Sequence, residues 1–119
     1  MTNLEIYNIA NKLLEAFSDE EQKFPVKLNF FLQKNKKLLV TLAQEIEESR
    51  INIAKKYGQL NENGSFIIGP ENTESAQGEL NALFNIEQNV DIMKINYNEL
   101  DPNMELTSAQ MEALMFMIE

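Results

Sequence analysis

Apolar residues recur every three or four positions along the first half of the chain, which is the spacing of one face of a helix. A helix start is predicted at Thr2 and Glu5, because this S/T-x-x-E capping box satisfies two backbone N–H groups at a helix N-terminus. We therefore expect a first helix from the start of the chain and a polar connector over residues 18–23. The apolar face of this first helix comprises Ile6, Ile9, Ala10, Leu13 and Phe17.

A much longer helix is predicted next. Residues 25–57 contain no Gly, and their one Pro is Pro25, at the first position, where its missing N–H is tolerated. Gly58 then provides a C-terminal stop. The apolar positions alternate in steps of four and three, which is a heptad-like seam for packing against other helices. The seam comprises Leu28, Leu32, Asn35, Leu39, Leu42, Ile46, Ser49 and Ile53, and we expect Phe31 and Leu38 to widen it.

The two helices differ in length, which leaves part of the seam without a partner. At 1.5 Å per residue they would span about 22 Å and roughly 50 Å, so the first covers about half of the second. The remainder must be covered by the C-terminal half or by another copy of the chain. Asn35, Leu39, Leu42 and Ile46 are therefore candidate residues of an oligomer or partner interface. Asn35 either fixes the register of the seam or lies at its wet edge, and the sequence favours the wet edge.

After Gly58 the pattern changes to short segments. Asn63-Gly64 is a strong hairpin-turn signal between Gln59-Leu60 and the apolar residues 66–68. A third helix is expected to follow, with Asn72, Thr73 or Ser75 as its cap and Gly78 inside it. Its apolar face carries Leu80, Leu83 and Phe84. A further strand is indicated by Val90, Ile92, Ile95 and Tyr97, and we expect it to pair with residues 66–68.

The C-terminus is predicted to form a turn and a short Met-rich helix. Asp101-Pro102-Asn103 is a turn signal, and Thr107 with Gln110 is a second capping box. The helix would place Met111, Leu114, Met115 and Ile118 on one face. We favour a core role, with this helix covering the long-helix seam. Because Met-rich surfaces adapt to partners, Met111, Met115 and Phe116 are alternatively candidates for an oligomer or partner interface.

These elements predict an α+β fold in one domain, residues 1–119. A chain of 119 residues has the length of a single domain that can bury its own core. Residues 1–58 would form a long helical hairpin, with a short first helix and a second of 33 residues. Residues 59–119 would form an acidic α+β half with a small two-stranded antiparallel sheet and two short C-terminal helices.

Charge divides the chain at the same place. Residues 1–58 carry nine Lys/Arg and eight Asp/Glu, a net of +1, whereas residues 59–119 carry one Lys and eleven Asp/Glu, a net of −10; the sum is −9. An acidic half of this kind is typical of a protein that acts through its surface. It disfavours direct binding to nucleic acid or anionic membranes, which need a positive patch. The candidate partner-binding residues are Glu62, Glu71, Glu74, Glu79, Glu87 and Asp91.

The densest basic cluster is Lys34, Lys36 and Lys37. In a nucleic-acid interpretation these lysines would contact phosphates and Phe30 would stack on a base. Since the whole chain carries a net charge of −9, we expect them instead to solvate one helix face or to pair with the acidic half of the same or a neighbouring chain.

The composition limits the chemistry available. The chain contains no Cys and no His, so it has neither disulfides nor the usual general base near neutral pH. Residues 101–112 match a calcium-loop register except that Leu106 stands where a Gly is needed. The helical run Glu45, Glu47 and Glu48 reads as a solvated face. We therefore predict no catalytic, cofactor-binding or metal site and a non-enzymatic protein. The chain start resembles no signal peptide and no apolar run spans a membrane, so we expect a cytoplasmic location.

The order and spacing of several segments resemble a family of small uncharacterised acidic proteins from phages and prophages of low-GC Gram-positive bacteria. The matching segments are residues 24–27, 31–35, 47–50, 55–58, 60–64 and 114–119. The resemblance implies a phage setting, where small acidic proteins are commonly inhibitors of host machinery or assembly factors. The expected function is inhibition or modulation of a host defence or nucleic-acid-handling protein through the acidic surface. The alternative is a virion structural or assembly factor that forms a homo-oligomer through the long-helix seam.

Overall fold

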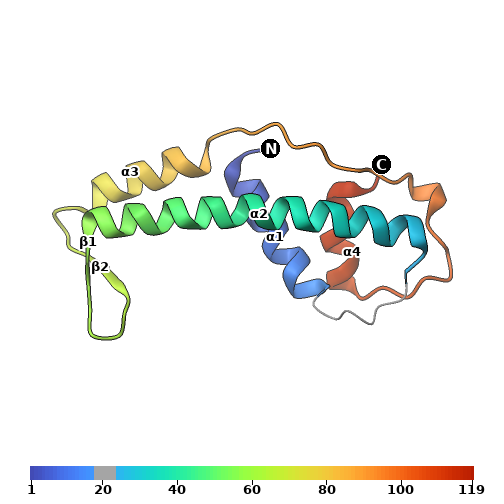
Figure 1. Ribbon diagram of the computed structural model, residues 1–119, viewed down its shortest axis with the longest axis horizontal. Coiled ribbons are helices and arrows are strands. Elements are labelled where there is room, and N and C mark those ends of the chain that lie inside the picture. The colour runs from blue at the N-terminus through green and yellow to red at the C-terminus, as the bar shows by residue number, and fades with distance from the viewer. Residues whose placement is uncertain (18–23) are drawn as a thin grey trace.

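One long helix, α2 (Val26–Tyr57), forms the axis of the molecule, and the rest of the chain packs along it (Figure 1). The fold is seen in a computed structural model that describes residues 1–17 and 24–119. It is elongated and measures 56 × 30 × 20 Å. The predicted α+β class with a helical hairpin is confirmed, and the helix that was expected over residues 25–57 begins one residue later. The polar connector predicted over residues 18–23 lies outside the described residues.

Helix α1 (Asn3–Ala16) begins at the predicted capping box. Glu5 donates its backbone N–H to the Thr2 hydroxyl at 3.1 Å, and its carboxylate accepts the Thr2 N–H at 3.2 Å. The helix crosses the middle of α2 obliquely and in the opposite sense (Figure 1), so that Tyr7 contacts Glu47 and the Phe17 carbonyl at the end of α1 contacts Lys36. Its inner face is the predicted one, with only Ile9 partly exposed; the buried members are Ile6, Ala10, Leu13 and Phe17.

Helix α2 ends where the sequence predicts, and it leads into a strand without a linker. The Gly58 N–H donates to the Ala54 carbonyl, and β1 (Gly58–Leu60) begins at the same residue. A Cβ on Gly58 would lie 2.7 Å from the Ala54 oxygen, so this close passage requires glycine. Most of the seam is buried. The prediction that Leu38 widens the seam was wrong, because 38% of this side chain is exposed. The fully buried seam residues are Leu28, Leu32, Asn35, Leu39 and Ile46.

The C-terminal part of α2 is covered by a hairpin and by α3 (Thr73–Phe84). The hairpin joins β1 to β2 (Phe66–Ile68), with Gly58 opposite Ile68 and Leu60 opposite Phe66. Gly64 has a φ of +80° in the turn, as the Asn-Gly signal predicts. The predicted α3 face is supplemented by Ala76, which is the buried residue of this helix.

Residues 86–96, here called the return segment, lead back along α2 to the other end of the molecule (Figure 1). The prediction that they pair with residues 66–68 was wrong, because β2 pairs with β1. The return segment instead makes single bridges, Thr2 with Glu87 and Ile95 with Ile118. Ile95 is buried in the core of the molecule and Val90 and Ile92 pack against that core, whereas Ile86 is 51% exposed. Apolar β-branched residues indicated an extended segment, but they did not specify its partner.

The chain ends with η1 (Tyr97–Glu99), α4 (Ser108–Leu114) and η2 (Met115–Met117), and α4 lies beside α1. The predicted Thr107–Gln110 capping box is present, and the Gln110 side chain also donates to the Ala16 carbonyl at 3.2 Å. The predicted apolar face was wrong in part. Because the last turn tightens into a 3₁₀ helix, Met117 is fully buried while Met115 is 64% exposed.

Two different parts of the chain thus cover the two ends of the long-helix seam. The return segment and η1 contact its N-terminal part through Asn35 and Lys27, and α1 covers the middle. The hairpin and α3 cover the C-terminal part. The C-terminal half of the chain supplies the cover that α1 is too short to give.

Candidate functional site

Ion pairs join the basic first half of the chain to the acidic second half. Lys12 of α1 contacts Glu112 at 3.2 Å. Two lysines of α2, Lys27 and Lys56, also pair with carboxylates beyond residue 58. Such exposed pairs stabilise the fold only modestly. They nevertheless show that part of the charge asymmetry is used inside the chain. The carboxylates that form no such pair are therefore the better candidates for a partner surface.

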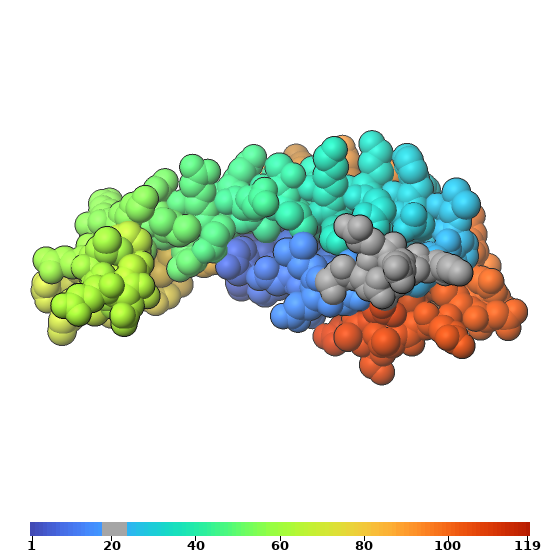
Figure 2. Space-filling model, turned by 60° about the horizontal axis from the view of Figure 1, so that its bottom comes forward, coloured from blue at the N-terminus to red at the C-terminus, as the bar shows by residue number. Residues whose placement is uncertain are grey.

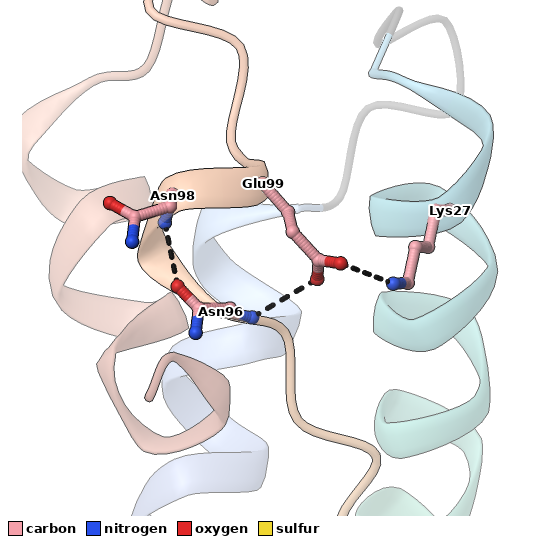
Figure 3. A network of polar contacts seen from close by, with 4 residues as sticks. All are labelled: Lys27, Asn96, Asn98 and Glu99. Atoms are coloured by element: carbon pink, nitrogen blue, oxygen red, sulfur yellow. Dashed lines mark hydrogen bonds and ion pairs between the residues drawn. The ribbon is translucent and has the colours of Figure 1, made fainter.

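Lys27 and Glu99 form the pair nearest the start of α2 (Figure 3). The Lys27 ammonium donates to Glu99 at 2.9 Å, and the other carboxylate oxygen accepts the Asn96 backbone N–H at 3.3 Å. These two donors lower the pKa of Glu99, Lys27 more than Asn96. The Asn96 side chain accepts the Asn98 N–H at 2.9 Å and so caps η1. The arrangement fixes η1 against α2, so Glu99 has a structural role.

Glu79 has a similar structural role, although it was a predicted partner-binding residue. Its carboxylate accepts from Lys56 at 2.9 Å and joins α3 to the last turn of α2. The Tyr57 hydroxyl and then the Lys56 ammonium lower the pKa of Glu79. Lys56 also lies 5.1 Å from the centre of the Tyr57 ring. Glu79 is therefore paired within the chain, and the partner-binding role expected of it stays a prediction.

The other predicted acidic residues do not form one surface. Glu87 is bridged to Thr2 beside the N-terminus, and Asp91 lies in the return segment against α2. Glu62, Glu71 and Glu74 lie at the hairpin and the start of α3, at one end of the long axis (Figure 1). All three are exposed, and none forms an ion pair within the described part of the chain.

The region formed by residues 58–74 is here called the hairpin end, and it combines these carboxylates with exposed apolar side chains. Leu60 is 64% exposed and Ile67 is 59% exposed. Both line a recess of about 380 Å³ together with Glu71, Tyr57, Gln59, Asn61, Gly69 and Asn72. Figure 2 shows the hairpin (yellow-green) projecting at one end, with a hollow between it and α1 (blue). Exposed apolar residues ringed by charge are a common feature of protein-binding surfaces.

A second recess, of about 500 Å³, lies between α2 and the return segment. We call it the lysine groove. The α2 wall contributes two exposed lysines and the half-exposed Leu38, and the return segment contributes Asp91 and Met93. Its lining residues are Lys34, Asn35, Lys37, Leu38, Thr41, Asp91 and Met93. The sequence identified the lysine cluster but gave no sign that residues 91–93 lie beside it.

The residues predicted for an oligomer or partner interface separate into two groups. Asn35, Leu39 and Ile46 are at most 2% exposed and are covered by the chain itself, and Leu42 is partly buried. The favoured wet-edge position of Asn35 was wrong: its side chain bonds the Met93 backbone in the interior. In the C-terminal group, Met111 and Met115 are exposed while Phe116 is partly buried.

The acidic run on α2 is also resolved by the structure. Glu47 accepts from the Tyr7 hydroxyl at 2.8 Å and from Arg50 Nε at 2.9 Å. Arg50 is the main cause of a lowered pKa at Glu47, and Glu47 in turn raises the pKa values of Tyr7 and Arg50. Glu45 and Glu48 are exposed, as a solvated face requires. The three residues do not converge on a common pocket.

The calcium-loop register is not assembled, because its members are used elsewhere. Thr107 caps α4, and Glu112 pairs with Lys12. Within residues 1–17 and 24–119, no group of three or more acidic side chains is arranged to hold a metal ion. Among the helices that the structure describes, none has the length and apolar character needed to cross a membrane.

No protein-family model, curated protein or solved structure matches this chain. The hairpin end and the lysine groove are therefore the features that bear on function.

Proposed function

We propose that this is a non-enzymatic interaction protein that binds a basic protein surface through its hairpin end. The observation that supports the proposal is the combination found there. Glu62, Glu71 and Glu74 are exposed without an ion-pair partner among the described residues. Glu71 lines the same recess as the exposed Leu60 and Ile67. Apolar anchors supply affinity, and surrounding charges supply selectivity and a fast association rate.

The contrast with the other carboxylates strengthens this choice of surface. Glu79, Glu99 and Glu112 are held by lysines of the first half, so a partner would have to break an ion pair to use them. The carboxylates of the hairpin end are available without such a cost. In the biological setting implied by the resemblance, the partner is a host defence or nucleic-acid-handling protein whose basic surface normally contacts phosphates.

The alternative of a virion assembly factor that oligomerises through the long-helix seam is less well supported. Leu28, Leu32 and Leu39 are at most 1% exposed, so another copy would reach them only after the fold had opened. We therefore place the hairpin end first and the seam second.

The proposal is tested by an affinity pull-down of tagged protein from host lysate at low and high salt. The test variant is Glu62→Gln/Glu71→Gln/Glu74→Gln. The matched control is Glu45→Gln/Glu48→Gln/Glu105→Gln, which removes the same charge from exposed residues elsewhere. A basic partner retained at low salt by the wild type and the control, but lost by the test variant, is the expected result. Equal retention by both variants would show that the hairpin end is not the binding surface.

A further inference from the structure

The lysine groove has the features of a docking site for an acidic, partly apolar protein segment. Lys34 and Lys37 form no ion pair within the described residues. Both lie on the α2 wall of the groove, beside the exposed Leu38. Lys34 lies 6.0 Å from the centre of the Phe30 ring, and Phe30 is 54% exposed. Leu38 and Met93 provide apolar contacts between the charges. The groove is therefore complementary to carboxylates that flank apolar side chains.

The return segment also leaves main-chain groups available at the groove. Asn35 bonds both the N–H and the carbonyl of Met93, and Ile95 bonds the C-terminal residues. In the part of the chain that the structure describes, the backbone groups of Val90, Asp91 and Ile92 form no hydrogen bond with another backbone group. Backbone groups without a backbone partner can accept an added strand.

We propose that the lysine groove binds the hairpin end of a second copy of this chain. The inference rests on the proposed function, because it names a partner for the same hairpin end. The hairpin end is complementary to the groove in three ways. Glu62 and Glu71 can pair with the two lysines, and Leu60 and Ile67 can contact the apolar lining. A strand of the hairpin can bond the free backbone groups of the return segment. The charges of the two surfaces are complementary even though the whole chain is acidic.

A single molecule cannot make this contact with itself. Residues 34–41 and Gly58 are separated by roughly 25–35 Å along one unbroken helix, so the hairpin cannot fold back into its own groove. The contact is therefore between two different surfaces of neighbouring copies. Heterologous contacts of this kind repeat from copy to copy and give rings or open chains, not only dimers. Self-association would thus increase with concentration and decrease with salt.

The test is the light-scattering mass of the purified full chain over a wide concentration range, at low and high salt. Lys34→Gln/Lys37→Gln removes the positive charges of the groove, and Glu62→Gln/Glu71→Gln removes the negative charges of the hairpin end. Each variant alone should associate about tenfold or more weakly than the wild type. Lys37→Gln alone should also weaken association, and Lys55→Gln is its matched control, because Lys55 is another exposed lysine of α2 and lies outside the groove.

Mixing the two double variants gives the sharpest result. One retains an intact hairpin end and the other an intact groove, so the mixture should form a complex of one copy of each and grow no further. Asp91→Asn, which removes the carboxylate of the groove, should strengthen association. A wild type that stays monomeric throughout, a mixture that stays monomeric, or variants that associate as well as the wild type would each overturn the inference.

The outcomes separate this inference from the proposed function. Lys34→Gln/Lys37→Gln leaves the hairpin end intact and should still bind a basic partner. A monomeric wild type that retains a partner at low salt would overturn only the self-association. Concentration-dependent association with no salt-sensitive partner in the lysate would overturn only the proposed function.

Discussion

Asn35 holds the backbone of Met93 in both directions: its side-chain amide donates to the Met93 carbonyl at 2.9 Å, and its side-chain oxygen accepts the Met93 N–H at 2.9 Å. One side chain on a helix thus pairs with an extended segment as a neighbouring strand would. The Asn35 side chain is 1% exposed, so these bonds are made away from water. The register between α2 and the return segment is fixed at this point.

Replacing Asn35 should therefore be costly. In Asn35→Ala, both polar groups of Met93 lose their partner, and we expect the free energy of unfolding to fall by about 2–4 kcal/mol. Asn52→Ala, at an exposed position of the same helix, is the control and should be neutral or slightly stabilising. Urea denaturation measures both. Equal stability of the two variants would contradict the pairing.

Adjacent leucines on α2 should respond very differently to truncation. Leu39 is fully buried, and Leu39→Ala should lower the free energy of unfolding by about 2–5 kcal/mol because it leaves a cavity in the core. Leu38→Ala, at a position that is 38% exposed, should cost less than about 1 kcal/mol. Thermal denaturation followed by circular dichroism distinguishes them. A larger loss at Leu38 would mean that the helix is rotated from the orientation described.

The contacts of Tyr7, Glu47 and Arg50 predict a pH dependence at both extremes. The lowered pKa of Glu47 stabilises the fold above its ordinary value of 4.5, and this contribution is lost as the pH falls through the lowered value. The raised pKa of Tyr7 stabilises the fold below 10.0, and this contribution is lost as the pH rises through the raised value. Stability should therefore decline in acid and again in strong base.

Tyr7→Phe tests the basic arm of this prediction. The variant should be less stable than the wild type at neutral pH and should show a shallower loss above pH 10.0, because the titrating hydroxyl is absent. Tyr97→Phe serves as the control, since Tyr97 is 65% exposed. Urea denaturation across the alkaline range gives the comparison. An unchanged alkaline loss in Tyr7→Phe would assign that loss to other groups.

Replacing either of two glycines by alanine should change the free energy of unfolding, but in opposite directions. Gly64 has a φ of +80°, and Gly64→Ala should lower the free energy of unfolding by about 1 kcal/mol because an L side chain disfavours this conformation. Gly78 lies inside α3 with open space around its Cα, and Gly78→Ala should raise the free energy by about 0.5–1 kcal/mol. Both changes are measured by urea denaturation. A destabilised Gly78→Ala would show that α3 is packed more closely than described.

The sequence predicted the local features of this fold well. Capping boxes at Thr2 and Thr107, the glycine stop at Gly58 and the Asn63-Gly64 turn were all confirmed. Each of these signals depends on bonds between residues close together in the chain, so neighbouring residues suffice to identify it. The extent of α2 follows for the same reason.

The long-range contacts could not be predicted in the same way. Periodicity showed that Leu39 faces inward, but it could not show whether α1, the return segment or another copy would cover the seam. Asn35 was placed at a wet edge because nothing in its neighbours points to Met93, whose backbone lies 58 positions away. The lysine groove was missed for the same reason. The ion pairs explain part of a charge asymmetry that the sequence alone assigned to a partner.

The position of the two termini has a consequence for the order in which the protein folds. The Met1 amino group donates to the carbonyl of Gln88, 87 residues away, and Lys12 contacts Glu112 across 100 residues. The half of the molecule that contains α1 therefore needs segments from both ends of the chain, whereas α3 and the hairpin lie close in sequence to the end of α2. During synthesis, the hairpin end can fold on its part of α2 while the last residues are still in the ribosome. Helix α1 can pack on α2 as soon as α2 is made, but the part of its face that α4 covers stays open until α4 is added.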